Sequence, residues 1–246
     1  MQNINFLSVV VPAYKQEKTI ARDIKNLDDV LSKLTYKYEI IVVVDGLLDK
    51  TFDNAKKTKK NYIKVFGYKE NQGKGHAVRY GMLKSRGDVV GFMDGGMDIS
   101  PTGISLLLDS MLWQDADIMI GSKLHPDSKV NYPVFRRILS WGYRTLTHIF
   151  FEFSIRDTQV GLKFFRREVV EKVFPKLLVK TFAFDVEILA VANSMGFKKI
   201  YEGPVELNFD GESSITSKNF WVIIFLMLWD TIAIFYRLKI IRYYGR

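Results

Sequence analysis

The stretch YEIIVVVDG, residues 38–46, decides the fold of this chain. Its apolar centre, Ile40–Val44, consists only of β-branched residues and ends directly on Asp45 and Gly46. β-Branched side chains favour strands, and a strand without polar alternation is typical of a sheet that is covered on both faces. The stretch therefore predicts a buried strand inside an α/β protein.

Three further stretches of the N-terminal half have the same character. Segments with helical spacing separate them, at Glu17–Leu34, at Thr51–Lys60 and after the glycine-rich turn at Gly73. Strand–helix alternation with apolar strands predicts a doubly wound, mostly parallel, Rossmann-like sheet, in which ligands bind beyond the carboxyl ends of the strands. The expected strands are FLSVVVPAY (6–14, stopped by Pro12), YIKVFGY (62–68) and GDVVGFMDGG (87–96). We therefore expect Pro12, Ala13, Tyr14, Asp45 and Asp94 to share one edge.

Composition narrows the class of protein. With 246 residues, 48% hydrophobic content and a mean hydropathy of −0.01, the chain suits one large domain and is neither disordered nor polytopic. The net charge of +9 favours an anionic partner. The absence of cysteine excludes disulfides and thiolate metal sites. The opening MQNINFLSVVVP lacks the features of an export signal, so a cytoplasmic location is expected.

The C-terminal part has a different pattern. Residues 132–151 are amphipathic at helical spacing, and Phe220–Tyr236 is apolar except for Asp230. The basic residues Arg237, Lys239 and Arg242 follow. An aromatic-rich apolar helix beside basic residues predicts an element lying in a membrane interface, whereas the alternative is a core helix with a solvated tail. The expected organisation is one α/β domain over 1–215, with an amphipathic segment at about 130–151, and an interfacial tail over 216–246.

Two short segments carry candidate ligand-binding groups. Asp94 and Asp98, in DVVGFMDGGMDIS (88–100), suit Mg²⁺ or Mn²⁺, although an ordinary turn explains them too. Asp45 is either a ligand in the expected crevice or a helix cap, and Asp49 suits the cap better. In NQGKGHAVRYG (71–81), backbone N–H groups and Lys74 would hold a diphosphate, unless the glycines only form a tight turn.

Taken together and in order, these motifs resemble glycosyltransferase family 2. Over residues 5 to about 210 the chain is most similar to the polyprenyl-phosphate glycosyltransferases of that family, and RDTQVGLKFF (156–165) is closest to the dolichyl-phosphate β-glucosyltransferase pattern. The other motifs are VVVPAYKQEKTI (9–20), EIIVVVDGLLDKT (39–51), ENQGKGHAVRYGMLKSRGDVVGFMD (70–94), MIGSKL (119–124), FRRILSWGYRTL (135–146) and FAFDVEIL (182–189). The resemblance implies a GT-A fold.

The resemblance also implies roles for individual residues. The nucleotide would be held by Pro12, Ala13, Tyr14, Glu17, Asp45 and Lys74. Asp94 would be the first aspartate of the Asp-X-Asp metal motif and part of the catalytic centre, and Asp98 would be a further metal-facing residue. The acceptor phosphate would be bound by Lys123, Arg136, Arg137 and Ser140, and Asp157 and Gln159 would lie near the sugar and acceptor.

The chain departs from the family at three places. Val44–Leu47 stands where the family has Asp-Asp-Gly-Ser, and Lys15–Glu17 stands where it has Asn-Glu-Glu. Gly96 replaces the second aspartate of the metal motif. The loss of this carboxylate predicts a weakened cation site and leaves open an inactive or slow enzyme.

The expected function is inverting transfer of a hexose, with glucose favoured, from a nucleotide sugar to a polyprenyl phosphate, with Mg²⁺ or Mn²⁺. UDP-glucose is the favoured donor, and GDP-mannose or a UDP-N-acetylhexosamine stay open. The expected place is the cytoplasmic face of a membrane, as a peripheral or monotopic protein. One alternative is a transferase with a saccharide acceptor and Asp157, Asp185 or Glu187 as base; the other is a nucleotide-sugar binding protein. Nucleic acid is disfavoured because the basic residues accompany apolar helices.

Overall fold

A seven-stranded sheet forms the centre of the protein, with strand order β3-β2-β1-β4-β6-β5-β7. The computed structural model describes residues 4–96, 98–128, 134–153, 155–207 and 220–245, without the side chains of residues 134–140, 220 and 221. The strands are β1 (Phe6–Ala13), β2 (Lys37–Asp45), β3 (Ile63–Tyr68), β4 (Val89–Met93), β5 (Ile118–Ser122), β6 (Leu162–Arg166) and β7 (Ile200–Pro204).

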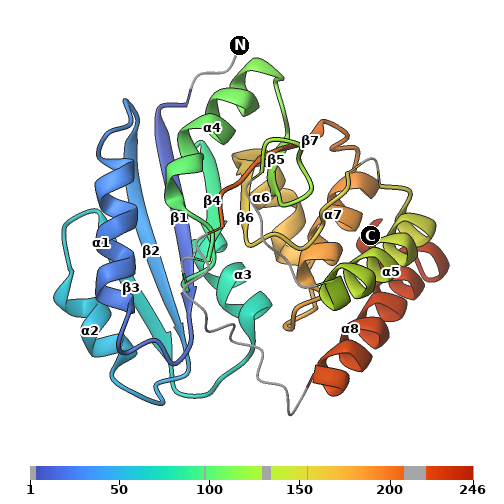
Figure 1. Ribbon diagram of the computed structural model, residues 1–246, viewed down its shortest axis with the longest axis horizontal. Helices are drawn as coiled ribbons and strands as arrows, with labels where there is room; N and C mark the ends of the chain where they lie inside the picture. The colour runs from blue at the N-terminus through green and yellow to red at the C-terminus, as the bar shows by residue number, and fades with distance from the viewer. Residues whose placement is uncertain (1–3, 97, 129–133, 154, 208–219, 246) are drawn as a thin grey trace.

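Helices cover both faces of this sheet, as the prediction of a doubly wound fold requires (Figure 1). The α-helices are α1 (Ile20–Leu31), α2 (Thr51–Lys57), α3 (Lys74–Lys84), α4 (Ile104–Trp113), α5 (Val134–Phe151), α6 (Arg167–Val173), α7 (Phe184–Ser194) and α8 (Phe220–Phe235). Short 3-10 turns lie at Pro101–Gly103, Phe174–Lys176 and Tyr243–Gly245, and α8 continues into a π-helix at Tyr236–Ile240.

The strand β1 shows why the apolar runs have no polar alternation. Val9 and Val11 pack in one core cluster with α1 and α4, while Val10 packs in a second cluster with α3 and α7. Because both faces are covered, all three side chains are fully buried. Pro12 does not end β1, as the sequence had suggested: the strand continues to Ala13 because pairing with β4 has already ended at Val10.

The sheet is mostly parallel, as predicted, with one reversed strand. β6 runs antiparallel to both β4 and β5, and Leu162 pairs with Met93. The start of β6 therefore lies at the edge where β4 and β5 end. This reversal places the residues before β6, including Asp157 and Gln159, on the same edge as Asp94.

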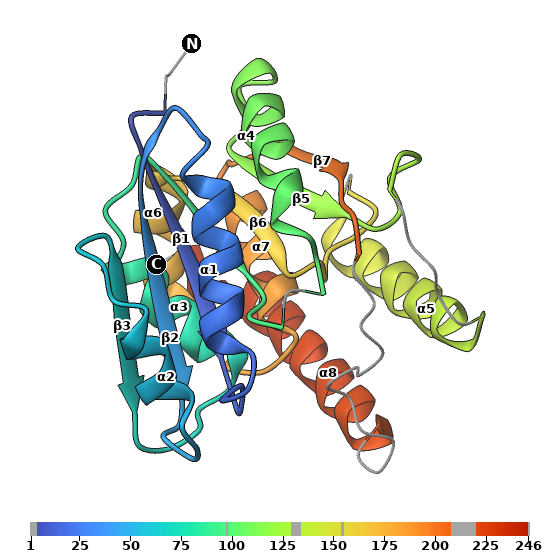
Figure 2. The same ribbon diagram turned by 60° about the vertical axis from the view of Figure 1, so that its left-hand side comes forward.

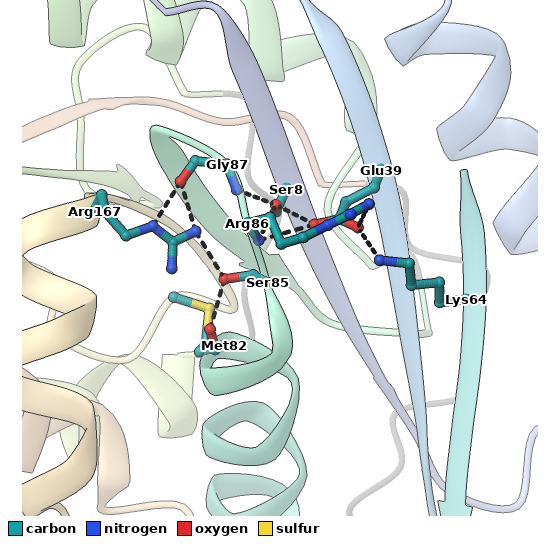
Figure 3. Close-up of polar contacts among 8 residues, drawn as sticks. All are labelled: Ser8, Glu39, Lys64, Met82, Ser85, Arg86, Gly87 and Arg167. Carbon is teal, nitrogen blue, oxygen red and sulfur yellow. Dashed lines mark hydrogen bonds and ion pairs between the residues drawn. The ribbon is translucent and has the colours of Figure 1, made fainter. Parts of the chain in front are cut away.

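A buried polar cluster at the opposite edge fixes the connection between α3 and β4 (Figure 3). Oε1 of Glu39 accepts hydrogen bonds from Ser8 Oγ (2.8 Å) and Arg86 N (2.9 Å), and Lys64 Nζ lies 2.7 Å from Oε2. Arg167 of α6 donates to the same connection from the other side. Burial by itself raises the pKa of Glu39, but these hydrogen bonds outweigh burial and hold its pKa below the usual value.

α5 and α8 lie side by side at one end of the molecule (Figures 1 and 2). The hydroxyls of Tyr143 and Thr231 are 2.8 Å apart, and the rings of Phe150 and Phe235 are 4.8 Å apart. Asp230, which interrupts the apolar sequence, accepts a hydrogen bond of 2.5 Å from Thr181 Oγ1. Within the described residues, no helix is long and apolar enough to cross a membrane.

The C-terminal segment is also fastened to the rest of the protein. Ile234 and Tyr244 belong to the same buried cluster as α3 and α7. Tyr244 donates a hydrogen bond of 2.5 Å to Oε1 of buried Glu187, and Arg237 forms an ion pair with the same oxygen at 3.5 Å. One side of the predicted tail therefore contributes to the core, as the alternative of a core helix requires.

Candidate active site

The candidate site lies at the carboxyl edge of the central strands. Ala13 is paired with Val44 at the end of β1 and β2, and Asp94 directly follows β4. The predicted gathering of these strand ends at one edge is therefore confirmed. The end of β5 and the start of β6 complete the edge, because β6 is reversed.

Asp94 forms an ion pair with Lys74 at the centre of the site. Lys74 Nζ lies 2.6 Å from Oδ1 and 2.8 Å from Oδ2 of the carboxylate. The backbone of Asp94 is held by a hydrogen bond of 2.9 Å from its N–H to the carbonyl of Gly161. Burial lowers the pKa of Lys74, but the negative charges of Asp94 and Asp185 outweigh burial and raise it overall. Lys74 is therefore a permanent positive charge.

Gly161 allows the carboxylate of Asp94 to lie where it does. A Cβ atom at position 161 would be 2.0 Å from Oδ2 and 2.1 Å from Cγ of Asp94. Any other residue at this position would therefore displace the carboxylate or the strand. This close approach gives a physical reason for the glycine in RDTQVGLKFF.

Asp98 supplies a second carboxylate beside Asp94. The residue is exposed, but the protein around it excludes part of its water, and this desolvation raises its pKa. The negative charge of Asp94 raises the pKa further, whereas Lys123 and Lys74 act in the opposite direction. Two neighbouring carboxylates of this kind favour the binding of a cation.

The oxygen atoms at this place fit a divalent cation. Carboxylate and amide oxygens are preferred ligands of Mg²⁺, which commonly keeps several waters and substrate phosphates. Oε1 of Gln16 is buried beside the loop and has no hydrogen-bond partner within the described residues. No group of three histidine or acidic side chains gathers in the part of the chain that is described. The residues present therefore fit a site with two carboxylates and one amide.

Asp45 holds the glycine-rich turn in front of Lys74. Its carboxylate is 3% exposed, and each oxygen accepts two hydrogen bonds. The donors are Tyr68 Oη (2.8 Å), Asn71 Nδ2 (3.0 Å), Gln72 N (2.8 Å) and Gly73 N (3.0 Å). Both oxygens are thus fully used within the protein, and Asp45 shapes the turn from which α3 begins.

Three backbone N–H groups of the predicted phosphate cradle are used within the protein. The N–H groups of Gln72 and Gly73 donate to Asp45, and the N–H of Gly75 donates to the carbonyl of Lys180 at 2.8 Å. These hydrogen bonds fasten α3 to β2 and to the 177–183 loop. Lys74 is left to act through its side chain. Asp49 was expected to be the N-cap of α2, but the N-cap is Lys50. Asp49 lies one residue earlier and accepts a hydrogen bond of 2.9 Å from the N–H of Thr51.

The other residues expected at the nucleotide lie around the end of β1. Pro12 and Ala13 are buried at the end of the strand. Tyr14 is 45% exposed, and Glu17 is exposed and accepts a hydrogen bond of 3.2 Å from Lys50 N. Tyr14 and Glu17 therefore offer an aromatic ring and a carboxylate on the open side.

The start of β6 is joined to the end of β5 through Asp157. Its carboxylate accepts hydrogen bonds from the N–H groups of Lys123 (3.0 Å) and Gln159 (3.3 Å), and its own N–H donates to Glu202 Oε1 (2.7 Å). The structure thus brings Lys123, Asp157 and Gln159 together, as the motif match implied. Arg136, Arg137 and Ser140 lie in the helix α5, but their side chains fall outside the described residues.

An ion pair between Lys163 and Asp185 lies buried behind the site, and its partnership was missed by the sequence reasoning. Lys163 Nζ donates to Oδ1 of Asp185 and to the carbonyl of Val160 (2.5 Å). Burial lowers the pKa of Lys163 and raises the pKa of Asp185, while their opposite charges hold the pair together. The available signal was the lysine inside the apolar run VGLKFF, because a buried charge needs a partner.

Fold and site agree with one class of protein. The chain belongs to glycosyltransferase family 2, because the family model "Glycosyl transferase family 2" matches residues 8–174. Two similar proteins are the dolichyl-phosphate beta-glucosyltransferases of Drosophila melanogaster and Saccharomyces cerevisiae. Their sequences are 38% and 34% identical to this chain over 77% and 76% of its length. The matches cover 63% and 62% of these relatives, so the chain spans less than two thirds of their length.

A solved structure supports the fold assignment. Glucosyl-3-phosphoglycerate synthase from Mycobacterium tuberculosis, in complex with Mn²⁺, UDP and phosphoglyceric acid, superimposes with a TM-score of 0.72. The match covers 94% of this chain and 78% of that one at 16% identity. This likeness confirms the GT-A fold that the motifs implied.

Proposed function

We propose that this protein transfers glucose from a nucleotide sugar to a polyprenyl phosphate and inverts the anomeric centre. UDP-glucose is the proposed donor. The names of the similar proteins from the fly and yeast support the sugar and the lipid phosphate, and the UDP bound to the solved neighbour supports the nucleotide.

The observation that carries this proposal is the state of the carboxylates that could act as a base. A saccharide hydroxyl needs a base to remove its proton. Asp157 already accepts two backbone N–H groups, and Asp185 is buried in its ion pair with Lys163. Glu187 is buried and accepts hydrogen bonds from the N–H groups of residues 178 and 179 and from Tyr244. All three candidate bases are therefore engaged in hydrogen bonds or an ion pair within the protein, which disfavours a reaction that needs one of them as a base.

A phosphate acceptor needs no such base. The second pKa of a phosphate monoester is near 6, so it is mostly dianionic at neutral pH. One of its oxygens forms a bond to the anomeric carbon while the bond from that carbon to the diphosphate oxygen breaks. The nucleoside diphosphate leaves with the electron pair. Attack opposite the leaving group converts an α-linked donor into a β-linked product.

The cationic side chains divide between donor and acceptor in this proposal. Lys74 stabilises the departing diphosphate, and Lys123 at the end of β5 binds the acceptor phosphate together with Arg136, Arg137 and Ser140. Asp157 positions Lys123 through its backbone, and Gln159 lies beside the sugar. A Mg²⁺ or Mn²⁺ ion bound by Asp94 and Asp98 would neutralise further charge on the diphosphate.

We also propose that the outer face of α8 lies against a membrane. Its exposed apolar side chains recur every three or four residues, which places them on one side of the helix. They are Val222, Phe225, Leu226, Trp229, Ile232 and Tyr236. The basic residues Lys239 and Arg242 lie just beyond and would meet anionic headgroups. The proposed arrangement is peripheral attachment at the cytoplasmic face, where the prenyl chain of the acceptor is anchored.

Transfer of radiolabelled sugar into a butanol-extractable polyprenyl phosphate tests the proposal. UDP-glucose should label the lipid, and GDP-mannose and UDP-N-acetylglucosamine should not. The assay is run with Mg²⁺, with Mn²⁺ and with a chelator. Label that goes to a soluble saccharide acceptor instead would establish the alternative transferase. UDP-glucose binding without transfer to either acceptor would indicate a binding protein.

A further inference from the structure

The loop between Asp94 and Asp98 has room for the side chain that Gly96 lacks. A Cβ atom at position 96 would lie 3.7 Å from Oδ1 of Asp98 and 3.7 Å from Nε2 of Gln16, which are ordinary contact distances. At Gly95, by contrast, a Cβ atom would lie 2.5 Å from the carbonyl of Pro12. Gly95 is therefore required by close packing, whereas Gly96 borders an open space between Asp98 and Gln16.

Gln16 is held firmly beside this space. Its N–H donates to Thr51 Oγ1 at 2.7 Å, and its carbonyl accepts hydrogen bonds from the N–H groups of Thr19 (3.1 Å) and Ile20 (2.9 Å). The backbone is thus fixed at the entry to α1. The side chain extends from there to the loop, where a Cβ atom at Gly95 would be 2.6 Å from Oε1.

The amide oxygen of Gln16 is a buried, unsatisfied hydrogen-bond acceptor: it accepts no hydrogen bond within the described residues. A buried acceptor without a partner is destabilising. The oxygen lies beside Gly95, and Nε2 faces the space beside Gly96. Rotation about the last side-chain bond exchanges the two atoms and turns the oxygen to that space, where a cation would give it a partner.

We propose that Gln16 provides a divalent cation with the oxygen ligand that is lost at Gly96. The cation would be bound by the carboxylates of Asp94 and Asp98 and by the amide oxygen of Gln16. Amide oxygens are suitable ligands for hard cations, but they carry no charge. The site therefore keeps its number of protein oxygens and has one negative charge fewer than the family's pattern. This inference rests on the proposed function in one respect: the diphosphate of the nucleotide sugar would be a further ligand of the same cation.

Mn²⁺ binding to the full chain in the presence of UDP tests this assignment, with free Mn²⁺ measured by electron paramagnetic resonance. Gln16→Met keeps the shape of the side chain but lacks the oxygen, and should weaken Mn²⁺ binding at least about tenfold. Gln16→Glu should bind Mn²⁺ more tightly than the native chain. Gly96→Asp combined with Gln16→Met should restore native affinity. The matched control is Gln114→Met, which replaces the glutamine that follows α4 and should leave the Mn²⁺ affinity unchanged.

Thermal unfolding without metal separates a ligand from a structural residue. Removal of an unpartnered buried oxygen should leave the melting temperature of Gln16→Met equal to or above that of the native chain. If this variant instead unfolds, Gln16→Glu decides, and Mn²⁺ affinity equal to or below the native value overturns the proposal. Unchanged affinity of a folded Gln16→Met, or no Mn²⁺ binding by the native chain, also overturns it. Glucose transfer that persists in chelator would then show that the proposed function stands without this cation site.

Discussion

Lys74 Nζ lies 2.6 Å from Oδ1 of Asp94, so the first residue of α3 is joined to the residue that follows β4. This ion pair places a permanent positive charge at the edge where the sugar donor is proposed to bind. Because the turn before Lys74 is held by Asp45, the position of the ammonium depends on β2 as well as on β4. In the proposed reaction, charge stabilisation of the leaving diphosphate would therefore depend on one lysine held by two strands.

Lys74→Met should lower kcat for glucose transfer about 10²–10³-fold, because one preorganised charge on the leaving group is removed. Steady-state assays with UDP-glucose and polyprenyl phosphate measure this loss. Lys59→Met removes an exposed lysine beyond α2 and should leave kcat unchanged. A Lys74→Met enzyme with native kcat would show that Lys74 does not act on the diphosphate.

Gly161→Ala should abolish transfer because the new methyl group would occupy the place of the Asp94 carboxylate. Gly142→Ala is the matched control: a Cβ atom there meets nothing within 4 Å, and alanine should stabilise α5 by about 0.5–1 kcal/mol. Activity and urea unfolding of both variants give the comparison. Native activity in Gly161→Ala would contradict the placement of Asp94.

Removal of one partner of the buried Lys163–Asp185 pair should lower the free energy of unfolding by about 3–5 kcal/mol, because an uncompensated charge stays buried. Lys163→Met combined with Asp185→Leu should recover most of this loss, and urea titrations measure the three variants. If the two residues did not interact, the loss of stability in the double variant would equal the sum of the losses in the two single variants. If Asp185→Asn folds with native stability but loses transfer, Asp185 acts as a base and the argument for a phosphate acceptor fails.

Glu39→Gln should lower the free energy of unfolding by about 1–3 kcal/mol at pH 7, since a charged acceptor of buried hydrogen bonds is lost. The pKa of Glu39 is lowered in the folded state, so its stabilisation is present above the unfolded value near 4.5 and disappears as the pH falls through the folded pKa. The difference in the free energy of unfolding between Glu39→Gln and the native chain should therefore become smaller below about pH 4.5. Glu168→Gln, at an exposed pair with Lys172, should cost less than 1 kcal/mol. A constant difference down to pH 3 would contradict the role of the charge.

Trp229→Glu should weaken binding to vesicles with anionic lipid about tenfold or more, because a large apolar side chain on the outer face of α8 becomes charged. Sedimentation with vesicles of phosphatidylcholine and phosphatidylglycerol measures the partition. Trp113→Glu, at an 82% exposed tryptophan at the end of α4, serves as the control. Equal loss in both variants would mean that exposed apolar area, and not the α8 face, causes binding.

The buried strands and their order along the chain were predictable because their β-branched runs are local signals. Ile40–Val44 lies in β2 as predicted, and α1, α2 and α3 begin within a few residues of their expected positions. The placement of Asp94 at the edge where the strands end also followed from the strand pattern, and the resemblance implied that Asp98 and Asp157 lie near it. The reversal of β6 was not predictable from its composition, because a short strand such as LKFFR can pair in either direction.

The sequence by itself determined the class of fold and the residue types that can bind phosphate or a cation, because strand periodicity and motif spacing are local properties. Only the tertiary structure decided which of these groups are free. It showed that Asp45 and the N–H groups of Gln72 and Gly73 are used internally, that Asp185 is paired with Lys163, and that the Gln16 oxygen accepts no hydrogen bond from the part of the chain that is described. Hydrogen bonds between residues far apart in the chain depend on the packing of strands and helices, and no local pattern contains that information.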